Sequence, residues 1–111
     1  MVEGVKKYLF DIKTSIDSIN AFLGDKRDFR IYQKNKMLRR AVEREFEIIG
    51  EALKKADQID PALRIENKGR IISLRNRVIH GYDKVDDEII WGVIIKHLPK
   101  LESEVKLLLA K

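Results

Sequence analysis

The sequence predicts an all-α protein, an antiparallel four-helix bundle with a short extra helix at its C-terminal end. Apolar residues recur at steps of three and four along most of the chain, which is the spacing of one helix face. Only two prolines and six glycines interrupt the 111 residues, and helix-favouring residue types dominate elsewhere. No stretch alternates apolar and polar residues for long. The length fits one domain, residues 1–111.

The first two helices are predicted from their apolar stripes. The first covers roughly Glu3 to Leu23, and Gly24 is a natural C-terminal stop. The second covers about Ile31 to Ala56, after a short linker. Its apolar face is made of Met37, Leu38, Ala41, Val42, Ile48, Ile49, Ala52 and Leu53.

The second half of the chain predicts two further helices and a terminal one. Residues 57–66 are expected to form a loop, and the third helix covers roughly Lys68 to His80. Asp86 is a plausible N-cap for the fourth helix. Pro99 is expected to break that helix, so that residues 99–111 form the short terminal helix.

Composition excludes several kinds of chemistry. The chain has no cysteine, which excludes disulfides, thiol catalysis and cysteine-ligated zinc. His80 and His97 are its only histidines, so we expect no metal site and no cofactor. The 23 Lys and Arg residues outnumber 18 Asp and Glu residues, but the two signs are interleaved. This charge is compatible with a polyanionic partner such as nucleic acid.

The same composition predicts a protein of the cytoplasm. Hydrophobic residues make up 44% of the chain and charged residues 37%. No apolar run reaches the length that crosses a bilayer, so no membrane association is expected. The N-terminal stretch MVEGVKKYLFDIKTSID has charges every few residues and lacks the features of a signal peptide.

The stretch ISLRNRVIHGYDKVD contains four side chains of the kinds that occur in active sites: Arg75, Asn76, His80 and Tyr82. On a helical wheel, Arg75 falls inside the broad apolar arc of the third helix. Asn76 and His80, four residues apart, lie together on one edge of that arc. A buried arginine needs a partner, because an unpaired buried charge is costly.

Two explanations for Arg75 are open. Glu45, in the middle of the second helix's apolar face, would supply a carboxylate and form a buried ion pair. Alternatively, the arc opens onto a cleft or a subunit interface, where the planar guanidinium would meet a phosphate.

Other candidates are expected to be structural. A lone His at a helix C-terminus is often a dipole cap, and a Tyr after a Gly is often a packing residue. His97 is assigned a structural role, because it stands near a helix end without a polar companion. Tyr32 and Trp91 are expected to pack in the core. A solvated face is expected from Glu43, Glu47 and Glu51.

Taken together, the motif resembles that of the HEPN superfamily, and within it the HepT-like toxins. The signature of an Arg, an adjacent polar residue and a later His is matched from Arg75 to His80, and the HepT-like extension adds a Tyr at Tyr82. AVEREFEIIGEALKK (Ala41 to Lys55) resembles the family's second-helix segment, and VDDEIIWGVIIKHLPKL resembles its fourth-helix segment. The resemblance implies a HEPN-like bundle.

The resemblance also implies a function. It implies a metal-independent endoribonuclease that acts as a homodimer on RNA, with Arg75 and His80 as catalytic residues in one composite cleft and Asn76 supporting them. It implies a toxin–antitoxin system, in which a nucleotidyltransferase antitoxin of the MntA type silences the toxin by transferring AMP to Tyr82.

The chemistry of these residues is consistent with RNA cleavage. An imidazole can act as base or acid at neutral pH, and two subunits would supply two of them. Arg75 would stabilise the charge that develops on the phosphate, and the product would be a 2′,3′-cyclic phosphate. Two alternatives remain: a non-catalytic nucleotide- or substrate-binding partner of a nucleotidyltransferase, and a helical dimerisation module. An RNase assay with EDTA present separates the first of these from the nuclease.

Overall fold

The expected all-α bundle is what the structure shows. The computed structural model describes residues 2–80 and 87–111, and in residues 76–80 it describes the backbone. Over these ranges the chain forms helices and no strand. They are α1 (Val5–Leu23), α2 (Phe29–Lys34), α3 (Lys36–Ile59), α4 (Lys68–His80), α5 (Asp87–Lys96) and α6 (Leu98–Leu109).

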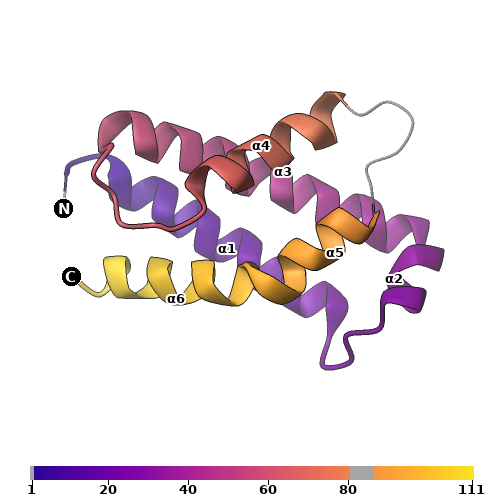
Figure 1. Cartoon of the computed structure of the whole chain (residues 1–111). Helices are drawn as coiled ribbons and strands as arrows, with labels where there is room; N and C mark the ends of the chain where they lie inside the picture. Colours follow the sequence, from indigo (N-terminus) through magenta and orange to yellow (C-terminus); the bar gives the residue numbers. More distant parts are fainter. Residues whose placement is uncertain (1, 81–86) are drawn as a thin grey trace.

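The long helices run in alternating directions (Figure 1). α3 returns antiparallel along α1, and α4 then crosses α3. α5 and α6 follow one another and together act as the fourth element, with α6 packed against α1. Both ends of the chain lie at the same end of the bundle.

The predicted second helix is wrong as a single element, because it divides at Asn35. This residue has an extended backbone (φ −101°, ψ 96°), and its side-chain oxygen accepts a hydrogen bond from the Leu38 N–H at 3.0 Å. An N-cap of this kind satisfies a donor that would otherwise be unpaired at the start of a helix. Asp28 caps the short α2 in the same way, through the Arg30 N–H.

The break near the C-terminus is also displaced from its predicted position. α5 ends at Lys96, and His97 separates it from α6. Pro99 therefore lies in the first turn of α6, where its missing N–H costs no intrahelical hydrogen bond. The predicted Asp86 N-cap lies outside the described residues, and Asp87 and Glu88 occupy the first turn of α5.

One core runs through the bundle and collects the apolar stripes of all the long helices. Its fully buried members include Leu9, Ile12 and Ile16 from α1 and Phe46, Ile49 and Leu53 from α3. Tyr32 and Trp91 pack as expected. Tyr32 is 1% exposed, and its ring lies 5.3 Å from that of Trp91, which ties α2 to α5.

Glu43, which the sequence assigns to a solvated face, is instead half-buried where α2, α3 and α5 meet. Burial, followed by the nearby Asp87 carboxylate, raises the pKa of Glu43 above its ordinary value of 4.5. Glu47 adds to the effect, whereas Arg39 and Arg40 oppose it. The folded protein therefore holds this proton to higher pH than the unfolded chain does.

We predict that Glu43→Gln stabilises the protein at neutral pH. The raised pKa means that Glu43 favours folding only when protonated, so this contribution is lost as pH rises through the folded pKa. Solvent screening of a half-buried group limits the gain to about 0.5 kcal/mol at pH 7. Urea unfolding at pH 7 and pH 4 should show the gain at pH 7 and little at pH 4. Glu3→Gln, at an exposed carboxylate, controls for the loss of one negative charge. An equal gain at both pH values would contradict the assignment.

Candidate functional site

Arg75 lies where α4 crosses α3, and a glycine makes this crossing close. A Cβ atom built on the buried Gly50 would lie 2.4 Å from the Arg75 Cβ and 3.0 Å from its Cγ and Cδ. Real Cβ atoms do not approach other heavy atoms so closely. The missing side chain of Gly50 therefore creates the space in which the stem of Arg75 lies.

The guanidinium of Arg75 pairs with Glu51, the residue after this glycine. Its Nη2 lies 2.6 Å from the Glu51 Oε2, and the side chains are 22% and 42% exposed. The predicted Glu45 partner is therefore wrong: the carboxylate lies six positions further along α3, about 9 Å along the helix axis. Lys55 approaches the other oxygen, with its Nζ 3.4 Å from Glu51 Oε1.

Arg75 helps to line a surface pocket of about 380 Å³ between α1 and α3. Tyr8 forms part of its wall, with the Lys7 Nζ 5.4 Å and the Lys55 Nζ 6.0 Å from the centre of its ring. These are distances at which a cation and an aromatic face attract one another. The charged side chains of the lining are Lys7, Asp11, Arg44, Glu47, Glu51, Lys55 and Arg75.

Cations and carboxylates thus alternate around this pocket, with cations in slight excess. Such a lining can bind an anion such as a phosphate through Arg75 and the lysines, while the carboxylates hold the cations in place. In the described part of the chain, no cluster of three or more His, Asp or Glu side chains is arranged to bind a metal ion.

The positions of three predicted site side chains are not described by the structure. The backbone of α4 includes Asn76 and His80, but their side chains are outside the description. Tyr82 lies outside the described residues altogether. Their convergence with Arg75 therefore stays a prediction.

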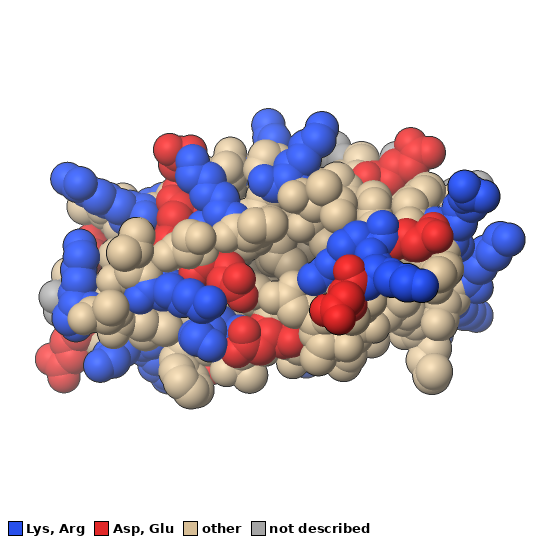
Figure 2. All heavy atoms as spheres, turned by 90° about the horizontal axis from the view of Figure 1, so that it is seen from below, with Lys and Arg blue, Asp and Glu red and all other residues tan. Residues whose placement is uncertain are grey.

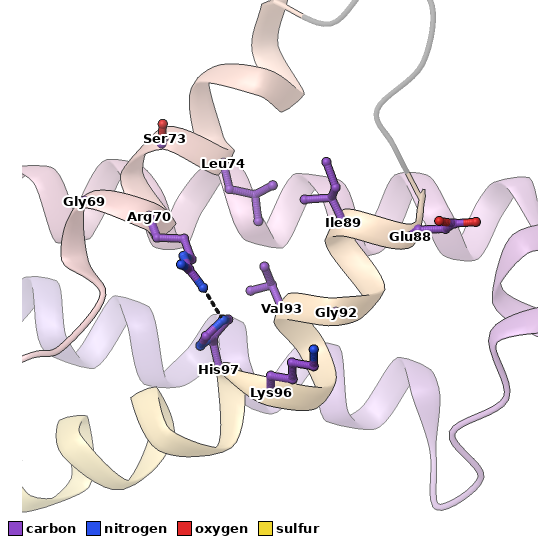
Figure 3. Close-up of a pocket in the computed structure, with 10 residues that line it drawn as sticks. All are labelled: Gly69, Arg70, Ser73, Leu74, Glu88, Ile89, Gly92, Val93, Lys96 and His97. Atoms are coloured by element: carbon purple, nitrogen blue, oxygen red, sulfur yellow. Dashed lines mark hydrogen bonds between the residues drawn. The ribbon is translucent and has the colours of Figure 1, made fainter.

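The sequence predicts no polar companion for His97, and this prediction is wrong. The Arg70 Nη1 lies 2.9 Å from the His97 Nε2, and Figure 3 shows the two side chains pointing toward each other from α4 and the α5–α6 junction. With the guanidinium as donor, the imidazole nitrogen accepts. Arg70 is exposed to solvent and still makes this contact.

Charge on the surface is mixed. On the face seen in Figure 2, Lys and Arg side chains alternate with Asp and Glu, and neither sign covers the face alone. None of the described helices combines the length and the apolar character that a membrane span requires.

Sequence reasoning missed Gly50, Glu51 and Tyr8 as parts of the site. One signal was present for Gly50: a glycine within a strongly helical pattern commonly marks a close packing contact. Glu51 lies in a row of acidic residues spaced by four, with Glu43 and Glu47, and nothing in that spacing distinguishes it from the other two. Tyr8 has no feature in the sequence that separates it from a core aromatic.

Comparison with known proteins gives consistent matches. The family model described as "Ribonuclease HepT-like" matches residues 12–108. Two similar proteins come from Methanocaldococcus jannaschii and Thermococcus cleftensis. The first, named "Putative RNase MJ1380", is 34% identical over 93% of this chain and 94% of its own length. The second, named "Probable ribonuclease HepT", is 32% identical over 89% of this chain and 90% of its own length. No solved structure gives a significant match.

We predict that Gly50→Ala destabilises the protein by about 1–3 kcal/mol, because the new methyl group would overlap the stem of Arg75. The loss would occur although alanine is the better helix former by about 1 kcal/mol. Gly92→Ala is a matched control, since a Cβ there would meet nothing within 4 Å and should stabilise α5. Denaturant unfolding of both variants measures the effect. Equal stabilisation by the two substitutions would refute the close crossing.

Proposed function

Because the chain belongs to the ribonuclease HepT-like family, we propose that it is a metal-independent endoribonuclease that acts in the cytoplasm as a homodimer, with Arg75 and His80 as its catalytic residues. One observation carries this proposal. The Arg75 guanidinium is held by Gly50 and Glu51 at the wall of a pocket that can take a phosphate. The helix that positions it continues to His80.

The proposed reaction needs no metal ion. One imidazole takes the proton of the RNA 2′-hydroxyl, and the 2′-oxygen attacks the adjacent phosphorus. The bond from phosphorus to the 5′-oxygen breaks, and the second imidazole, present in its protonated form, donates its extra proton to that oxygen. The products are a 2′,3′-cyclic phosphate and a 5′-hydroxyl. Each chain brings one His80, so two copies around one cleft supply both the base and the acid.

Arg75 would stabilise the charge that develops on the phosphate oxygens. Its ion pair with Glu51 fixes the side chain before RNA arrives, so less conformational entropy is lost on binding. Glu51 acts through Arg75 and is therefore a positioning residue. Asn76 would support the site by orienting the imidazole or the phosphate.

The family also suggests how the activity is controlled. We place the chain as the toxin of a toxin–antitoxin system whose antitoxin is a nucleotidyltransferase of the MntA type. Transfer of AMP from ATP to the phenol oxygen of Tyr82 would release pyrophosphate and add a phosphodiester and a nucleoside close to the motif. The added negative charge and bulk would exclude RNA.

We predict that Arg75→Ala and His80→Ala each reduce RNA cleavage at least about 100-fold. Cleavage of a labelled single-stranded RNA in EDTA measures this, with circular dichroism to verify folding. Arg64→Ala removes an exposed guanidinium from the 60–67 loop and should leave cleavage unchanged. Light scattering should give about twice the chain mass of 13.0 kDa for the active species.

Three outcomes would count against this assignment. Full cleavage by the folded His80→Ala variant would show that His80 is not the base. Full activity in a monomer would show that no composite cleft is needed. Nucleotide binding without any cleavage by the unmodified protein would favour the non-catalytic partner instead.

We predict that co-expression with such a nucleotidyltransferase adds AMP to the wild-type chain and abolishes its cleavage of RNA. The Tyr82→Phe variant lacks the acceptor oxygen, so it should keep its mass and its activity under the same conditions. Intact-mass spectrometry and the RNase assay measure the two effects. An adenylylated Tyr82→Phe chain would place the modification elsewhere.

A further inference from the structure

A second pocket lies on the other side of α4, between α4 and α5. We call it the α4–α5 groove (Figure 3), and its volume is about 620 Å³. Gly69 of α4 and Gly92 of α5 both line it, and a Cβ at either position would meet nothing within 4 Å. The two glycines therefore keep the walls of the groove free of side chains at these points.

One end of the α4–α5 groove is basic. Arg70, Lys96 and His97 gather there, and Arg70 and His97 are in contact at 2.9 Å. Arg70 and Lys96 are exposed, so their charges are available to a ligand. A guanidinium has five N–H donors, and the contact with His97 uses one of them. The exposed Ser73 adds a hydroxyl on the α4 wall.

The middle of the groove is apolar. Leu74 and Val93 form its floor and are 3% and 6% exposed, and Ile89 adds an aliphatic surface that is 38% exposed. Glu88 lies at the far end, and in Figure 3 its carboxylate points away from the basic end. A ligand that fits this order of surfaces carries an anionic group at one end and a flat or apolar group next to it.

We propose that the α4–α5 groove binds a nucleotide, with its phosphate between Arg70 and Lys96 and its base over Leu74, Val93 and Ile89. The planar fork of an arginine matches two phosphate oxygens, and a lysine and a hydroxyl complete a common phosphate environment. A base buries its flat face against apolar side chains. A free nucleotide and a nucleotide within an RNA strand share this chemistry.

The RNA form of the proposal rests on the proposed function, which it extends. Arg70 and Arg75 stand five residues apart on one helix, roughly 140° apart around its axis. A strand held in the groove would therefore contact the flank of α4 opposite the Arg75 pocket. The groove would then be a subsite for a nucleotide distant from the cleaved bond, and would add affinity without taking part in the chemistry.

The test uses the whole chain and two probes. One is AMP, and the other is an oligouridylate of about ten nucleotides whose 2′-O-methyl groups prevent cleavage. Amide shifts in ¹H–¹⁵N spectra locate each probe and give its affinity. We expect shifts at Gly69, Arg70, Gly92 and Lys96. Arg70→Ala should weaken binding about tenfold, since it removes a charge-assisted contact, and Arg64→Ala should not.

Gly92→Leu supplies a second variant, because its side chain would enter the open space and occupy the groove. It should abolish binding while the far-UV circular dichroism stays that of the wild type. Binding of AMP and the strand alike supports a general nucleotide site, and binding of the strand alone supports an RNA subsite. If neither probe moves the groove amides, or if Arg70→Ala and Gly92→Leu both bind like wild type, the proposal is overturned. If the groove instead binds an acidic, apolar peptide, neither AMP nor the RNA strand would shift the groove amides.

Cleavage by the wild-type chain, measured separately, distinguishes failure of the groove from failure of the proposed function. A chain that binds nucleotides in the groove but never cleaves RNA would refute the nuclease and leave the groove. A chain that cleaves RNA, with Gly92→Leu binding and cleaving equally well, would refute the groove and leave the nuclease.

Discussion

The contact between α3 and α4 at Gly50 is the constraint on which the rest of the site depends. Because this glycine has no side chain, the stem of Arg75 lies directly against the backbone of α3. The guanidinium then reaches Glu51, whose second oxygen also meets Lys55. If the proposed function holds, a phosphate of the RNA would meet a guanidinium that is already held in one place. The phosphate would then either replace Glu51 as the anionic partner of Arg75 or bind beside it.

Much of the fold follows from the spacing of apolar residues. Helices α1 and α4 span nearly the residues that the sequence predicts, because burial of one apolar face dominates the stability of such helices. The errors occur at helix ends. Asn35 divides the second helix by capping α3, and His97, rather than Pro99, separates α5 from α6. Single hydrogen bonds and backbone angles set these boundaries, and apolar periodicity carries no information about them.

The site was less predictable than the fold, for a physical reason. The sequence correctly indicates that Arg75 needs a partner and that a carboxylate of α3 can supply it. It could not identify Glu51 over Glu45, because the choice depends on the angle at which α4 crosses α3. Likewise, the pairing of Arg70 with His97 joins residues 27 positions apart, and only the docking of α5 brings them together.

The aromatic cluster between α2 and α5 has a practical consequence. Trp91 is the single tryptophan of the chain, and its ring packs 5.9 Å from Phe29 and 5.3 Å from Tyr32, both residues of α2. The fluorescence of Trp91 therefore reports the docking of that short helix. The far-UV circular dichroism reports mainly the long helices α1 and α3. The molecule carries an intrinsic optical reporter for one local step of its own folding, with no label required.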